Sequence, residues 1–111
     1  MSLIRYHALI PAENPARAGR SLNVLLVMEN PTDRDVFQTV RLFGSLGGPW
    51  RELVAEDRAF PAHSHPHLYF TIPDAQLSPD FWGGEGVEEL ELFAGERPPE
   101  DTGRGVLVFF E

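Results

Sequence analysis

Apolar residues along this 111-residue chain occur in short runs that are separated by glycine, proline, asparagine and aspartate. Within most runs apolar and polar residues alternate, which is the pattern of β-strands that bury one face. The runs recur about every ten residues, a spacing typical of all-β sandwiches and barrels. The expected strands are Ile4–Ile10, Leu22–Met28, Val36–Phe43, Trp50–Val54, His67–Ile72, Val87–Ala94 and Val106–Phe110.

The alternation also predicts which side chains are buried. In the first run Tyr6, Ala8 and Ile10 share one face of an extended segment with Ile4, and we expect that face to be buried. The second run is apolar on both faces in its middle, which indicates a central strand. The ring of Trp50, at the start of the fourth run, is expected to lie against the core.

A long connection, Asp74–Gly86, separates the fifth and sixth runs. Ser78-Pro79 is typical of the start of a helical turn, and the glycines at 83 and 84 end it. Trp82 lies beside Phe81 in this glycine-rich loop, and exposed aromatic side chains of this kind dominate many binding surfaces. We therefore expect Phe81 and Trp82 to contact a partner.

The last run, Val106–Phe110, is apolar on both of its faces. Such a strand is either covered on both sides or paired along its edge with another chain. Edge pairing would produce a homo-oligomer through the C-terminal strand. Val108, in the middle of the run, is the residue that we expect at this contact.

Length and composition indicate a single domain over residues 1–111. The net charge is −8 and there is no basic stripe, so nucleic acid and anionic membrane surfaces are not expected partners. The chain has no cysteine, which favours a cytoplasmic protein, and it shows no export signal or apolar membrane span. Nucleophile elbows and phosphate-binding loops are absent too, so no catalytic residue is assigned.

Acidic residues are concentrated in the last third of the chain. Their spacing does not match a calcium-binding loop, and they indicate a solvated acidic face that would repel some partners and attract a basic one. These residues are Glu85, Glu88, Glu89, Glu91, Glu96, Glu100 and Asp101.

Three histidines, His63, His65 and His67, recur at every second position. In an extended chain their imidazoles would point to one side, which is a layout that can hold a divalent transition metal. The alternative interpretation is a polar loop that leads into the next strand, without any metal. Pro66 interrupts the strand pattern and favours this second interpretation.

The His63-Ser64-His65 segment resembles the first motif of the cupin family, in which a His-x-His pair is followed by a glutamate ligand. The resemblance implies a small barrel that is a metal-binding protein or a metalloenzyme, in which the three histidines hold the metal. Tyr69 and Phe70 occupy the positions where the glutamate would stand, and no histidine follows His67 to supply a further ligand. A metal would therefore need a carboxylate from another strand, such as Glu89 or Glu91.

A second resemblance covers about half of the chain, from Ser21 to Ile72. An apolar strand that runs into Asn30-Pro31-Thr32, a strand with Phe37, and a Pro-Ala segment before an aromatic strand resemble bacterial immunoglobulin-like domains. This resemblance implies an antiparallel β-sandwich of about seven strands that serves protein contact without catalysis. The resulting hypothesis is a non-enzymatic protein-interaction or accessory module without a cofactor, and its alternative is the cupin-like metal protein.

Overall fold

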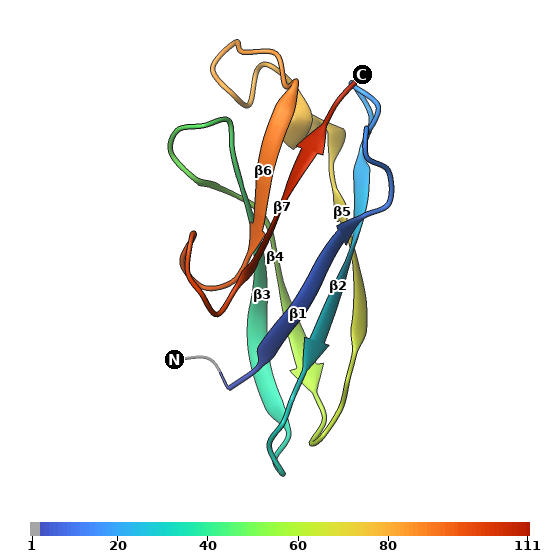
Figure 1. Ribbon diagram of the computed structural model, residues 1–111, viewed down its shortest axis with the longest axis vertical. Coiled ribbons are helices and arrows are strands. Elements are labelled where there is room, and N and C mark those ends of the chain that lie inside the picture. Colours follow the sequence, from blue (N-terminus) through green and yellow to red (C-terminus); the bar gives the residue numbers. More distant parts are fainter. Residues whose placement is uncertain (1–2) are drawn as a thin grey trace.

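The computed structural model describes residues 3–111, and in this range the chain forms seven β-strands and one short 3-10 helix (Figure 1). The strands are β1 (Arg5–Pro11), β2 (Leu22–Glu29), β3 (Val36–Ser45), β4 (Arg51–Phe60), β5 (His67–Ile72), β6 (Glu89–Ala94) and β7 (Arg104–Phe109), and the helix is η1 (Asp74–Leu77). No helix in residues 3–111 has both the length and the apolar character that a membrane crossing requires.

The strands form two antiparallel sheets, β1-β2-β5 and β4-β3-β6-β7, which face each other in an elongated molecule of 46 × 23 × 19 Å. The antiparallel sandwich of seven strands is therefore confirmed. The connections after β1, β3 and β5 gather with the C-terminus at one end, here called the C-terminal end (Figure 1). The connections after β2 and β4 lie at the opposite end.

The hydrophobic core lies between the sheets and is built from the inward-facing side chains of the central strands. Leu26 and Met28 of β2, Leu42 of β3 and Leu90 of β6 are fully buried. The prediction that β2 is central is confirmed, since it pairs with both β1 and β5. Each buried aliphatic side chain of this size contributes about 1.5–3 kcal/mol to folding, so the burial of these side chains holds the two sheets together.

A β-bulge changes the buried face of β1. The pairing of β1 with β2 skips His7, which is the extra residue of the bulge. Beyond this point the alternation is reversed, so Leu9 is buried and Ile10 is exposed. The prediction that Ala8 and Ile10 share the buried face of Tyr6 is wrong for this reason.

A second bulge lies in β4 at Leu53, between the pairs that this strand makes with β3. Both Leu53 and its neighbour Val54 pack in the core, and the alternation before them is shifted. The ring of Trp50 therefore lies on the outer face of the four-stranded sheet, against Phe93, and not against the core as predicted. The strand also continues to Phe60, well beyond its expected end, whereas the other six strands agree with the expected ranges within two residues at each end.

The connection after β5 differs from its expected form. The 3-10 helix η1 occupies Asp74–Leu77, so it ends where a helical turn was predicted to begin. Ser78 has extended backbone angles because the following proline disfavours the helical conformation of its predecessor. Pro79 instead opens a turn, in which its carbonyl accepts a hydrogen bond from Gly84 N at 2.7 Å.

The side chain of Asn30 links the connection between β2 and β3 to the end of β4. Its fully buried side chain donates to the carbonyl oxygens of Arg34 at 2.7 Å and Phe60 at 2.9 Å, with a third carbonyl, that of Pro61, at 3.2 Å. Its amide oxygen accepts hydrogen bonds from the backbone N and the hydroxyl of Thr32. The Asn-Pro turn that the sequence predicts is therefore held by a network that also reaches the end of β4.

Candidate functional site

The main chain of the histidine segment extends the sheet beyond β5. Pro66 O accepts a hydrogen bond from Met28 N at 3.1 Å, and Ser64 O accepts one from Asn30 N at 2.9 Å. The segment that was expected to be either a loop or a metal-binding strand thus continues the pairing of β5 with β2.

His63 and His65 on this extension and His67 at the start of β5 are all exposed, but they do not come together as ligands. His63 has a left-handed backbone angle, φ 55°, which departs from the extended chain that the alternating pattern assumed. Across residues 3–111, no three side chains among His, Asp and Glu are arranged to hold a metal ion. The structure therefore does not assemble the predicted set of His63, His65 and His67.

The carboxylates that were expected to complete the metal shell lie elsewhere. Glu89 and Glu91 are on the outer face of β6 in the four-stranded sheet, where they pair with Phe109 and Leu107 of β7. His67 and the segment that carries His65 belong to the other sheet, the one formed by β1, β2 and β5. The two groups therefore occupy opposite sides of the sandwich.

His65 instead faces Glu29, a residue that the sequence analysis did not single out. The Nε2 atom of His65 is 4.0 Å from one oxygen of the Glu29 carboxylate, and Nε2 of His7 is hydrogen-bonded to the other oxygen at 2.8 Å. Arg5 lies 4.0 Å away on the same face. This cluster was missed because it depends on the bulge that places His7 beside β2.

The pKa of Glu29 is held below its usual value of 4.5, mainly by the hydrogen bond with His7 and also by the charges of His65 and Arg5, with partial burial acting in the opposite direction. A carboxyl group whose pKa is lower in the folded state stabilises the fold above its unfolded pKa, and this contribution is lost as the pH falls through the folded value. The cluster therefore favours the folded protein at neutral pH.

We expect the stability of the wild type to fall more steeply than that of Glu29→Gln as the pH is lowered from 4.5. The glutamine has no proton to gain, so it removes this contribution at every pH. Urea unfolding at successive pH steps measures the difference. Glu89→Gln, an exposed glutamate on the other sheet, is the control, and equal pH slopes for the wild type and Glu29→Gln would contradict the assignment.

Phe81 and Trp82, the predicted contact residues, lie at the C-terminal end of the sandwich and are half-buried. Their rings meet edge to face with centroids 5.3 Å apart, and both pack against the edge of the core. The Arg51 guanidinium lies over the Phe81 ring, 3.8 Å from its centroid, and donates a hydrogen bond to the Phe81 carbonyl. Trp82 Nε1 donates to Gln76 O at 2.8 Å.

A surface hollow of about 520 Å³ adjoins these rings, between the β3–β4 connection and the loop before β6. Its chemistry is mixed, because the indole of Trp82 and the side chain of Leu46 are apolar whereas Arg51 and Glu85 carry opposite charges. The remaining residues that line it are Gly47, Gly48, Pro49 and Gly83. Trp82 therefore presents only part of its ring to a partner, and its polar group is already satisfied.

Val108, the third predicted contact residue, is fully buried between the sheets. The outer edge of β7 is covered by the chain after β1. Ala16 N donates to Phe109 O at 2.7 Å, and the Asn14 side-chain amide donates to Leu107 O at 3.0 Å. Pairing of this edge with another chain would have to displace these hydrogen bonds. A charged substitution of Val108 would disrupt the core, so it could not be used to test pairing at the edge.

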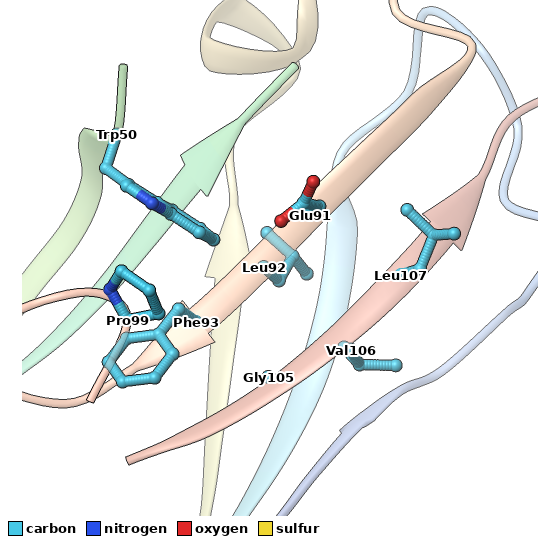
Figure 2. A pocket seen from close by; sticks show the side chains of 8 residues that line it. All are labelled: Trp50, Glu91, Leu92, Phe93, Pro99, Gly105, Val106 and Leu107. Atoms are coloured by element: carbon cyan, nitrogen blue, oxygen red, sulfur yellow. The ribbon is translucent and has the colours of Figure 1, made fainter. Parts of the chain in front are cut away.

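A second hollow, of about 390 Å³, lies on the outer face of β6 and β7 (Figure 2). Figure 2 shows Trp50, Phe93 and Pro99 on one side of it, Leu107 on the other, and the Glu91 side chain between them. The remaining residues that line it are Leu92, Gly105 and Val106. Gly105 has no side chain to occupy the space beside Phe93, and this absence leaves the hollow open.

The Trp50 ring is positioned by Phe93, whose ring meets it edge to face with centroids 6.1 Å apart. Phe93 is buried even though it points away from the core, because the β6–β7 connection passes over it without side chains at Gly95 and Gly103. Phe93 follows Glu89 and Glu91 on the outer face of β6, and its contact with Trp50 is not indicated by the local sequence pattern.

A comparison with family models finds no match, and a comparison with curated protein sequences finds none either. Solved structures do match. A β-glucosidase from Erythrobacter marinus has a TM-score of 0.76 at 13% identity, over 97% of this chain and 15% of that chain. A β-glucosidase from Listeria innocua in complex with glucose has a TM-score of 0.71 at 15% identity, over 96% of this chain and 15% of that one.

A β-glucosidase from Bifidobacterium adolescentis also matches, with a TM-score of 0.68 at 13% identity over 95% of this chain and 17% of that chain. At these identities the likeness concerns the fold. The chain thus has the fold of a small β-domain that makes up less than a fifth of the length of much larger enzymes.

Proposed function

We propose that this chain is a non-enzymatic module for protein interaction, of the accessory kind that larger enzymes contain. The observation that carries the proposal is the match of nearly the whole chain to only 15–17% of the β-glucosidase chains. In those proteins a domain of this fold is part of a much longer chain. Fold analogy alone does not establish a function, so the surface has to supply a means of contact.

The contact surface that we propose is the C-terminal end of the sandwich around Trp82. The ring is half-buried and held by Gln76 O and Arg51, so little conformational freedom is lost when a partner covers it. Its hollow brings a tryptophan and an arginine together beside apolar walls, and tryptophan and arginine are enriched among the residues that contribute most to protein binding.

We expect Trp82→Ala to weaken partner binding by at least about tenfold, as the loss of a central aromatic contact does. Immobilised protein would first capture a partner from a lysate of the source organism. Mass spectrometry would identify it, and calorimetry with the purified partner would then give the affinity. Phe37→Ala is the matched control, since Phe37 is 81% exposed and lies on β3 near the opposite end of the molecule.

Two results would overturn the proposal. The first is a folded Trp82→Ala protein, verified by its NMR spectrum, that binds the identified partner as tightly as the wild type does. The second is turnover of an aryl glycoside by the purified chain that is lost when one of its carboxylates is replaced.

A further inference from the structure

We propose that the hollow beside Trp50 binds an arginine side chain of a basic partner segment. This inference rests on the proposed interaction function and names the chemistry of the partner. Its volume of about 390 Å³ lies in the range of ligand-binding sites in proteins. Its walls are an indole, a proline and an exposed leucine, and its single charged lining residue is Glu91 (Figure 2).

The Glu91 carboxylate is available for a ligand. Glu29 is engaged by His7, and Glu52 by Arg41. For the Glu91 carboxylate, by contrast, no hydrogen bond or ion pair is found with any group in the described part of the chain, residues 3–111. A carboxylate beside an aromatic ring attracts a cation both by its charge and through the negative face of the ring.

The surroundings of Glu91 favour a positively charged partner. Glu89 lies on the same face of the same strand, and the adjoining surface at the start of β6 is lined by Glu85 and Glu88. No arginine or histidine lines the Trp50 hollow or the surface formed by Glu85, Glu88 and Glu89. With a net charge of −8 on the chain, this face would steer a basic segment toward the Trp50 hollow and repel an acidic one.

Arginine fits this hollow better than lysine because of its planar group. A guanidinium can stack on an indole while its N–H groups donate in parallel to a carboxylate, which a compact ammonium cannot do. A related arrangement is present at the neighbouring site, where the Arg51 guanidinium lies over the Phe81 ring and donates to the Phe81 main-chain carbonyl. Trp50 Nε1 has no hydrogen-bond partner within residues 3–111, and it could donate to a main-chain carbonyl of the bound segment.

The test is an NMR titration of the full chain with a blocked Gly-Ser heptapeptide that carries one arginine at its centre. The chain has two tryptophans, so two indole N–H signals report on the two hollows. We expect the Trp50 indole and the Gly105 amide to shift while the Trp82 indole stays in place. The lysine version should bind more weakly, and the glutamate version should produce no shift.

The matched variants are Glu91→Gln and Glu89→Gln, which remove one charge each from neighbouring exposed positions of the same strand face. We expect Glu91→Gln to weaken binding of the arginine peptide by about tenfold or more, because a hydrogen bond to a charged group is worth at least that factor. Glu89→Gln should weaken it by less than about twofold, as an exposed charge at a distance does.

Each contrary result overturns the proposal. Equal effects of Glu91→Gln and Glu89→Gln would indicate a diffuse acidic face without a specific site. A shift of the Trp50 signal with the glutamate peptide, or with a β-linked glucose disaccharide, would indicate that the hollow binds another ligand. The absence of any Trp50 shift with the arginine peptide would also reject it. If the arginine peptide does not bind while partner binding still depends on Trp82, only this inference is rejected. If partner binding does not depend on Trp82 either, the proposed interaction function is rejected as well.

Discussion

Asn30→Ala is expected to lower the free energy of unfolding by about 3 kcal/mol or more, since each buried carbonyl that loses its donor costs about 1–3 kcal/mol. The Asn30 amide is fully buried and is hydrogen-bonded to the carbonyls of Arg34, Phe60 and Pro61. The substitution also removes the acceptor of the two hydrogen bonds from Thr32. Urea unfolding followed by tryptophan fluorescence measures the loss.

Two further variants make this result specific to the amide. Asn30→Asp keeps the shape of the side chain but places a carboxylate against three carbonyl oxygens, so it should destabilise the fold as well. Asn23→Ala is the control, because Asn23 accepts an exposed hydrogen bond from Thr71, which is worth about 1 kcal/mol or less. A loss for Asn30→Ala no larger than that of Asn23→Ala would show that the network does not stabilise the fold.

Gly103→Ala is expected to be the most disruptive substitution of a glycine, with a loss of about 3 kcal/mol, at the upper end of the cost of overpacking a buried site. A Cβ atom at this position would overlap the ring of Phe93 and would lie 2.5 Å from the carbonyl oxygen of Ala94. The backbone oxygen cannot move without breaking the β6–β7 pairing. The melting temperature should fall by more than about 10 °C in a domain of this size.

Because Phe93 positions Trp50, the same substitution should also change the Trp50 hollow. We expect the Trp50 indole signal to move in the NMR spectrum of Gly103→Ala while the Trp82 signal changes little. Gly48→Ala is the control, since a Cβ there meets no atom within 4 Å. If both alanine variants have the same melting temperature, the close approach at Gly103 does not constrain the fold.

Much of the architecture could be predicted from the chain alone. Alternation predicted the strands that carry the core residues Leu26 and Leu42, and proline and glycine marked the connections, because a strand that buries one face needs side chains of period two. The full extent of β4 could not be predicted, since its second half carries the charged residues Glu56, Asp57 and Arg58. Only the pairing with β3 keeps that segment extended.

The candidate sites were predictable to a smaller degree. Phe81 and Trp82 were found because glycines flank them in a long connection, and the structure does place them beside a hollow at the surface. The histidines were expected to share a ligand site, but only His65 approaches a carboxylate, that of Glu29. The Trp50 hollow was not foreseen, because the face of the sheet on which Trp50 lies depends on the bulge at Leu53 in the following strand.

The sequence by itself determined the fold class, the order of the seven strands along the chain and the position of β2 at the centre of its sheet. These follow from local periodicity and turn residues, which are properties of neighbouring positions. Only the tertiary structure decided which side chains meet on the two outer faces. The bulges at His7 and Leu53 reverse the alternation, and strands that are distant in sequence supply the partners. One extra residue in a strand reverses the facing of the side chains on one side of the bulge relative to those on the other. The grouping of Trp50 with Glu91 and of His7 with Glu29 therefore depends on strand register.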